Sequence, residues 1–196
     1  MSLMNNISFK QYRAIDLGIM AVILFVFETL TVLAGKWFPM ENYTLSPTTL
    51  MLCIVMMRWD GFAAIHAVVG GFAFCLVAGA EPKQFIIYCV GNCFALLGLI
   101  MLKVCGKEKV RSKIPFVLVY VVIVFISIQV GRWLVSMIFG SSFDSIITFL
   151  LADSLSLLFA AVSVLISRKM DGLFEDQKHY LIRTEEERMR ERNSIE

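Results

Sequence analysis

Three ionisable residues and one amide lie inside long apolar stretches of the sequence. Glu28, Arg132 and Asp153 are ionisable, and Asn92 contributes the amide. A charge is costly to place in a bilayer, so an ionisable residue in a span is a candidate for function. An arginine there can hold a carboxylate or phosphate with two parallel hydrogen bonds, and a carboxylate can hold a cationic or amide group. Alternatively, Arg132 pairs with Glu28 or Asp153 only to neutralise both charges.

Further polar and aromatic residues are expected on the outward side of the membrane. We expect them to line one outward-opening cavity for a small molecule, together with the four residues above. Lysine and arginine suit an anionic group, and aromatic rings can stack on a planar ligand. The candidate binding residues are Glu28, Asn42, Tyr43, Lys83, Tyr88, Asn92, Gln129, Arg132, Trp133 and Asp153.

The sequence lacks the motifs of nucleotide hydrolysis and of common hydrolases. It contains no GxxxxGK[ST] phosphate loop, no GxSxG and no HExxH. The two histidines, His66 and His179, are far apart, and the five cysteines form no CxxC pair. We therefore expect no enzyme activity, no cofactor and no metal site. If the chain moves a solute with energy, we expect a partner to supply that energy.

The composition indicates an all-α, polytopic membrane protein. The 196 residues are 58% hydrophobic and 17% charged, whereas about 25% of residues are charged in a soluble domain. A water-soluble fold of this size could not bury so much apolar surface. No cleavable signal peptide is evident, because the first apolar run lacks a clear small-residue cleavage site.

Six transmembrane helices are predicted, because a span needs about 20 mostly apolar residues. The stretch 45–79 is too long for one helix and contains Arg58-Trp59-Asp60-Gly61, so a turn is expected there. This division puts both termini in the cytoplasm and leaves two basic residues outside, Lys36 and Lys83, as the positive-inside rule favours. We expect a multi-pass protein of the cell membrane, in a bacterial plasma membrane. The predicted spans are 17–35, 45–57, 62–78, 85–102, 114–139 and 146–166.

The predicted membrane domain covers residues 1–167, and a charged cytosolic tail covers residues 168–196. The tail holds seven of the eighteen Lys and Arg residues and eight of the sixteen Asp and Glu residues. Its apolar residues recur at roughly helical spacing, which predicts an amphipathic helix. In the first span, Ala14 and Gly18 are four residues apart and Ala21 follows one turn later. Such small residues allow close helix packing, either inside the protein or against another membrane subunit.

The chain resembles the substrate-binding (S) components of energy-coupling factor (ECF) vitamin transporters over roughly residues 8–168. The shared features are the length, six spans, both ends inside, a short second span and a third span rich in glycine and alanine. Two stretches are similar to the turn between spans two and three and to span four of that family. They are Arg58-Trp59-Asp60-Gly61-Phe62-Ala63-Ala64 followed by Gly70-Gly71, and Tyr88-Cys89-Val90-Gly91-Asn92.

The resemblance implies a subunit that captures a vitamin or related micronutrient in an outward-side cavity. The cavity would be built from the first loop and the outer halves of spans four to six. It also implies three partners, a transmembrane coupling protein and two cytosolic ATPases. The partners would dock on an AxxxA-like motif in span one, with Ala14, Gly18 and Ala21 as docking residues. Here the motif reads Ala14-Ile15-Asp16-Leu17-Gly18, so glycine takes the second place and an acid lies inside it.

Two other functions fit the same spans. The first is a structural membrane scaffold of the rod-shape-determining type, without a ligand, whose interaction surfaces are the small-residue faces and the tail. The second is a subunit of a membrane enzyme with Arg132 and Asp153 in its catalytic set, although no nucleophile–base pair is recognisable. Nucleic acid is not expected as a partner, because no basic patch lies on a soluble domain.

Overall fold

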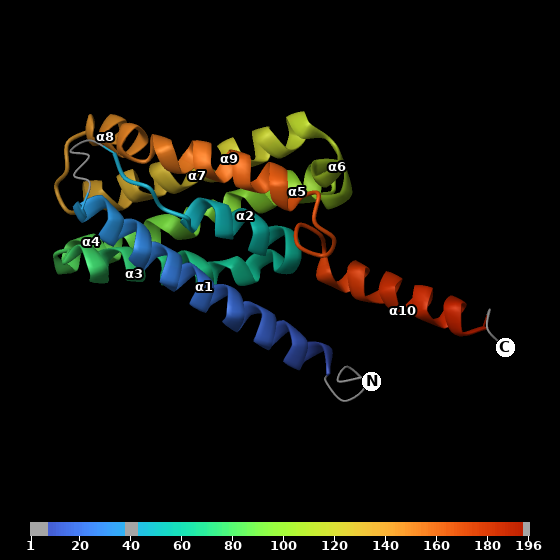
Figure 1. Ribbon diagram of the computed structural model, residues 1–196. Coiled ribbons are helices and arrows are strands. Elements are labelled where there is room, and N and C mark those ends of the chain that lie inside the picture. The colour runs from blue at the N-terminus through green and yellow to red at the C-terminus, as the bar shows by residue number, and fades with distance from the viewer. Residues whose placement is uncertain (1–7, 38–42, 194–196) are drawn as a thin grey trace.

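The computed structural model describes residues 8–37 and 43–193, and this part of the chain is helical without any strand (Figure 1). The short 3₁₀ turns η2 (Asp60–Phe62) and η3 (Cys93–Leu97) join α2 to α3 and α4 to α5. The all-α class is therefore confirmed for these residues. The helices are α1 (Phe9–Trp37), α2 (Thr48–Trp59), α3 (Ala63–Ala78), α4 (Pro82–Asn92), α5 (Gly98–Cys105), α6 (Lys107–Ser112), α7 (Ile114–Ile138), α8 (Ser145–Ala152), α9 (Ser154–Ser167) and α10 (Gln177–Asn193).

Four helical runs are long and apolar enough to cross a membrane. The pair α8 and α9, bent by 44° at Asp153, makes a fifth if the two helices form one span. Helices suit this environment because they satisfy their own backbone hydrogen bonds where no water is present. These runs are consistent with a multi-pass membrane protein. They are Phe9–Trp37, Thr48–Ala78, Pro82–Cys105 and Ile114–Ile138.

The run Thr48–Ala78 folds back on itself. A β-carbon added to Gly70 would collide with the hydroxyl of Thr48, although 22 residues of straight helix would separate these positions by about 33 Å. The reversal occurs at Asp60, whose φ of 53° and ψ of −126° lie outside the helical region, and at Gly61. The predicted turn is therefore confirmed, and α2 and α3 form an antiparallel pair.

Helix α2 lies at the centre of the bundle. Ten of its twelve residues are buried, and it contacts α1, α3, α7 and α9. A helix that is apolar all round is stable when other helices surround it. At about 18 Å it is shorter than the hydrocarbon layer. A helix of this length does not need to cross the hydrocarbon layer by itself when other helices cover it on all sides.

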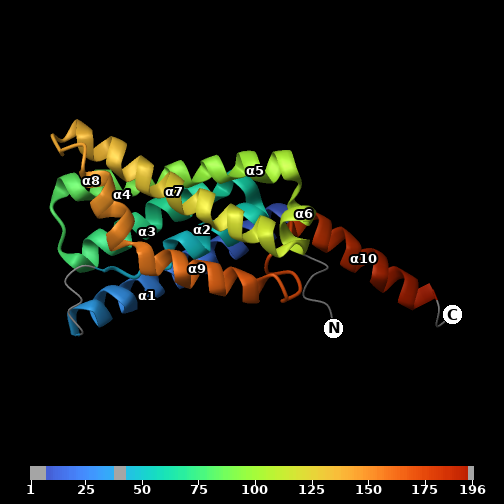
Figure 2. The same ribbon diagram turned by 90° about the horizontal axis from the view of Figure 1, so that it is seen from above.

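Glycines allow α3, α4 and α7 to approach each other closely. A β-carbon on Gly71 of α3 would lie 2.8 Å from the carbonyl carbon of Tyr88 in α4. One on Gly91 of α4 would lie 2.6 Å from Cα of Arg132 in α7. Figure 2 shows these helices side by side, and small residues at such crossings are typical of membrane helices.

Both ends of the described chain lie at one end of the bundle, next to α6 and the turn between α2 and α3 (Figure 1). Most basic residues outside the apolar helices lie in the segments at this end, including those of the stretch Lys103–Lys113, which runs from the last turn of α5 through α6. The opposite end carries the turn between α3 and α4, with Lys83, and the end of α1, with Lys36. The two ends of the bundle therefore differ strongly in basic charge.

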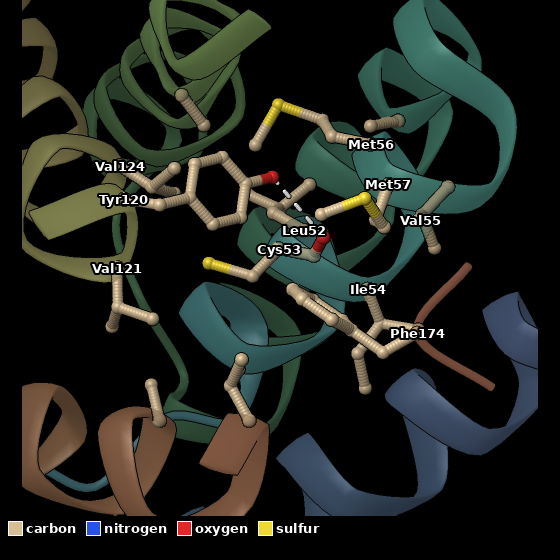
Figure 3. Close-up of a cluster of buried hydrophobic side chains, with 14 of the residues drawn as sticks. Leu52, Cys53, Ile54, Val55, Met56, Met57, Tyr120, Val121, Val124 and Phe174 are labelled. Atoms are coloured by element: carbon tan, nitrogen blue, oxygen red, sulfur yellow. Dashed lines mark hydrogen bonds between the residues drawn. The ribbon is translucent and has the colours of Figure 1, made fainter. Parts of the chain in front are cut away.

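The start of the predicted tail folds back into the bundle. Phe174 is fully buried, and its ring centroid lies 6.4 Å from that of Tyr120 (Figure 3). The Tyr120 hydroxyl donates a hydrogen bond to the Cys53 carbonyl at 3.1 Å, and Arg58 donates to the carbonyls of Gly172 and Leu173. Residues 172–174 therefore seal this end of the core, whereas α10 extends away from it (Figure 2).

Ion pairs hold the same region in place. Arg58 pairs with Asp16 at 2.7 Å, and Lys107 pairs with Asp60 at 2.9 Å and Asp176 at 2.6 Å. Burial raises the pKa of the Asp176 carboxyl, but Lys107 and hydrogen bonds from His179 outweigh it, so the pKa lies below its usual value. Ion pairs to Lys107 therefore connect the turn after α2 and the tail to the start of α6.

We expect Gly91→Ala to destabilise the protein, because the added methyl group would meet the α7 backbone. Overpacking of this kind costs about 1–3 kcal/mol. Gly18→Ala is the matched control, because no atom lies within 4 Å of its β-carbon position. Thermal unfolding in detergent compares the two variants, and equal melting temperatures would contradict the close crossing of α4 and α7.

We expect Phe174→Ala to lower the stability by about 3–5 kcal/mol, because it removes a fully buried ring. Phe27→Ala on the exposed face of α1 is the control and should change the melting temperature little. A Phe174→Ala protein as stable as the wild type would show that the tail does not seal the core.

Candidate functional site

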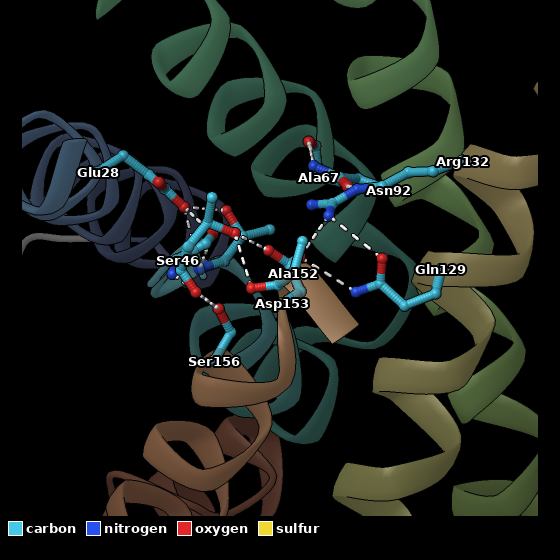
Figure 4. A network of polar contacts seen from close by, with 11 residues as sticks. Glu28, Ser46, Ala67, Asn92, Gln129, Arg132, Ala152, Asp153 and Ser156 are labelled. Atoms are coloured by element: carbon cyan, nitrogen blue, oxygen red, sulfur yellow. Dashed lines mark hydrogen bonds and ion pairs between the residues drawn. The ribbon is translucent and has the colours of Figure 1, made fainter. Parts of the chain in front are cut away.

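A buried polar network joins α1, the segment before α2, α4, α7 and the break between α8 and α9 (Figure 4). All members except Thr44 are almost completely buried. Polar groups in such a place must bond to one another, because no solvent is present to replace a missing partner. The network comprises Glu28, Thr44, Ser46, Thr48, Asn92, Gln129, Arg132, Asp153 and Ser156.

Arg132 is the centre of the first half of the network. Its Nη1 forms an ion pair with Asp153 and donates to Oε1 of Gln129 at 3.4 Å, and its Nε donates to Oδ1 of Asn92 at 2.9 Å. Gln129 lies three residues earlier on the same face of α7 and donates to Asp153 at 3.1 Å. The guanidinium also lies over the ring of Tyr88, at 4.5 Å from its centroid. Arg132 is therefore neutralised by Asp153 and held from three sides.

Glu28 is the centre of the second half. Its Oε1 accepts hydrogen bonds from the hydroxyls of Ser46 and Thr48 and from the Thr48 backbone N–H, the last at 3.2 Å. Its Oε2 is buried and has no hydrogen-bond partner among the described residues. Pro47 lies between the two hydroxyl residues, just before α2 begins. The entrance to α2 therefore wraps one oxygen of this carboxylate and leaves the other bare.

Two hydroxyl residues connect the halves. Thr44 donates to Oδ1 of Asp153. Ser156 donates to the Thr44 carbonyl at 3.3 Å and accepts from the Ser46 backbone N–H at 2.8 Å. Residues 44–48 thus run between Glu28 and Asp153 and bond to both.

With both of its carboxyl groups ionised, the network carries a net negative charge. It contains one positive group, Arg132, and two carboxyl groups, Glu28 and Asp153. Arg132 is bonded to Asp153, and no cationic side chain is bonded to Glu28 in the described part of the chain. A buried charge without a partner is energetically costly. Glu28 therefore lacks the counter-charge that an ionised carboxylate needs at this depth.

A cavity of about 480 Å³ lies beside the network, between the ends of α1 and α3 and the segment before α2. Thr44 belongs to both the cavity wall and the network. Phe74 lines the cavity and stacks on Tyr88 with a centroid distance of 4.8 Å. The cavity is therefore linked to Asp153 through Thr44 and to Arg132 through Phe74 and Tyr88. Its lining residues are Thr31, Val32, Ala34, Gly35, Lys36, Tyr43, Thr44, Leu45, Phe74, Ala78 and Leu155.

The structure brings together most of the candidate binding residues. Tyr43 lines the cavity but is not part of the network. Lys83 pairs with the exposed Glu81 at 2.8 Å, and Trp133 donates to the Phe143 carbonyl at 3.1 Å, so neither touches the network. Asn42 lies outside the described residues. The members that meet are Glu28, Tyr88, Asn92, Gln129, Arg132 and Asp153, whose role in binding a ligand stays a prediction.

Sequence reasoning missed the hydroxyl residues Thr44, Ser46 and Thr48 and gave no role to Ser156. Their signal is a cluster of serine and threonine around Pro47 at the start of a short apolar helix. Such hydroxyls are common at helix starts, so the pattern alone does not point to Glu28. Only the packing of α1 against this segment shows the connection.

The predicted docking residues lie mostly on an open face of α1. Ala14 and Gly18 are exposed and Ala21 is half-buried, whereas α1 buries Leu17 and Met20 on its other side. The small residues at 14 and 18 are therefore not explained by packing inside the chain. Docking of a partner there stays a prediction.

No family model, no curated protein and no solved structure matches the chain. Within the described residues, no group of three or more His, Cys, Asp and Glu side chains is arranged to hold a metal ion. The geometry of the buried network and its cavity therefore carries the functional argument.

We expect Arg132→Gln and Asp153→Asn each to destabilise the protein by about 3–5 kcal/mol, because either change leaves a buried charge without its partner. The double variant should lose much less stability than the sum of the losses in the two single variants. Lys83→Gln removes an exposed ion pair and should have little effect. Thermal unfolding of the four proteins tests this, and additive losses would contradict the ion pair.

Proposed function

We propose that the chain is a membrane-embedded substrate-binding subunit, which captures a vitamin-like small molecule from the outside for ATP-driven uptake by partner subunits. The observation that carries the proposal is the cavity of about 480 Å³ against the buried polar network. Small-molecule sites have about 300–1,000 Å³, apolar walls and a few fixed polar groups. This cavity has all three features.

The proposed topology has six membrane crossings with both termini in the cytoplasm. The reversal at Asp60 supports it, because α2 and α3 then run in opposite directions through the bundle, with the short α2 surrounded by other helices. The basic end of the bundle, which carries α6 and both chain ends, faces the cytoplasm under the positive-inside rule (Figure 1). The cavity lies at the opposite end, between the last turns of α1 and α3, and therefore opens outward.

The walls of the cavity indicate the class of ligand. Tyr43 and Phe74 offer aromatic surface for a planar ring, and Thr44 offers a hydroxyl. Lys36 lies in the wall with its Nζ donating to the Val77 carbonyl at 2.7 Å, so it can also meet an anionic group. Arg132 is engaged by Asp153 and is absent from the wall. In this proposal Arg132 does not contact the ligand but holds Tyr88, which stacks on Phe74 in the cavity wall. Lys36 is the residue that pairs with an anionic group of the ligand.

The energy for uptake comes from partners in this proposal. The chain has no phosphate loop of its own. The exposed Ala14 and Gly18 on α1 offer a flat apolar surface that another membrane helix can approach closely. A transmembrane coupling protein on this face and two cytosolic ATPases complete the proposed assembly.

The second candidate function is a structural scaffold without a small-molecule ligand. The observation in its favour is that Arg132 and Asp153 satisfy one another, so this pair is accounted for by stability alone. In that case the exposed face of α1 and the projecting α10 would be the working surfaces. The two functions differ in whether the cavity holds a ligand.

Native mass spectrometry of the purified protein is expected to show a bound small molecule of a few hundred daltons. Ala78→Trp places a large side chain in the cavity wall and should abolish this species, whereas Ala14→Trp on the outer face of α1 should retain it. Thermal shift across a panel of vitamins gives a second measurement. An empty wild-type protein without any thermal shift would favour the scaffold.

A further inference from the structure

The hydrogen bonds around Glu28 fit an ionised carboxylate. Oε1 accepts three hydrogen bonds, two from hydroxyls and one from a backbone N–H. A protonated carboxyl would carry a donor of its own. A proton on Oε2 would find no acceptor among the described residues, and a proton on Oε1 would have to be donated to the Ser46 or Thr48 hydroxyl, which then could not donate in return. In its ionised form Glu28 therefore has one oxygen with three hydrogen bonds and one bare oxygen.

This charge has no counter-charge from a side chain bonded to it. Arg132 is the one cationic member of the network, and Asp153 already neutralises it. Apart from Arg132, the titratable groups around Glu28 bring no positive charge. The titratable and charged groups facing Glu28 are Arg132 of α7, Asp153 between α8 and α9, Cys75 of α3 and Tyr88 of α4.

Lys36 is the cationic residue of α1 closest in sequence to Glu28, and it is engaged elsewhere, as is the buried His66. Lys36 lies eight residues after Glu28, about 12 Å along the helix axis, and bonds to the Val77 carbonyl. His66 bonds to the carbonyl of Leu17, eleven residues before Glu28. Neither side chain is therefore bonded to Glu28.

We propose that Glu28 is a binding site for a monovalent alkali cation, Na⁺ or K⁺, with the hydroxyls of Ser46 and Thr48 as further ligands. Hard cations prefer oxygen ligands, and the three side chains supply only oxygen. A single positive charge balances the net negative charge of the network, whereas a divalent cation would reverse it. The proposal does not depend on the captured solute.

The position of the site gives the cation a structural effect. Ser46 is tied through Ser156 to Thr44, and Thr44 lines the cavity. A cation held by Glu28, Ser46 and Thr48 therefore orders one wall of the cavity. The cation then stabilises the folded chain, as any ligand that binds only the native state does.

The test measures the melting temperature of the full chain in detergent, without added solute. NaCl or KCl is titrated against choline chloride at constant ionic strength and constant pH, so screening does not change. We expect a saturable rise of a few degrees with one of the alkali cations. Glu28→Gln keeps the shape of the side chain but removes its charge, so its melting temperature should not respond. Glu81→Gln removes an exposed carboxylate and should respond like the wild type.

Two milder variants cover the case in which Glu28→Gln does not fold. Ser46→Ala and Thr48→Val each remove one ligand oxygen and should raise the half-saturating cation concentration at least tenfold. The proposal is overturned if the wild type does not respond to Na⁺ or K⁺, or if Glu28→Gln responds as the wild type does. It is also overturned if the melting temperature depends on pH alone, because a proton would then be the balancing charge.

Discussion

The buried ion pair between Arg132 and Asp153 is the interaction on which the arrangement of the helices depends. Removing either partner would leave a buried charge without its counter-charge, which is costly inside a membrane protein. Satisfying Arg132 draws Asn92 of α4 and Gln129 of α7 to one point. Satisfying Asp153 places the break between α8 and α9 against the segment that carries Thr44. One pair thus sets the positions of four parts of the chain.

Glycine makes this meeting possible. Gly91 lets the backbone of α4 reach that of α7 at Arg132, so Asn92 can contact the guanidinium directly. Gly71 brings α3 against Tyr88, whose ring lies under the same group. At the other end, Phe174 and the bonds from Arg58 close the core. The interior of the bundle is therefore polar near the cavity, where one carboxyl oxygen lacks a partner. It is apolar and closed by Phe174 at the end where the chain begins and ends.

The electrostatic imbalance is the feature that links stability to function. Burial opposes a negative charge on Glu28, and the second oxygen of this carboxyl has no partner in the described chain. The shared wall through Thr44 places this carboxylate close to the cavity that we assign to the solute.

The sequence by itself determined the helical class, the turn at Asp60 and the residues whose charges needed partners. These follow from local composition, because apolar length and the cost of a charge in lipid are readable one segment at a time. It did not determine that Arg132 pairs with Asp153 and not with Glu28, or that Lys83 and Trp133 lie outside the polar network. Nor did it determine that Ser46 and Thr48 donate hydrogen bonds to Glu28. Tertiary structure decided these contacts, because they join residues distant in the chain and depend on how closely the helices pack.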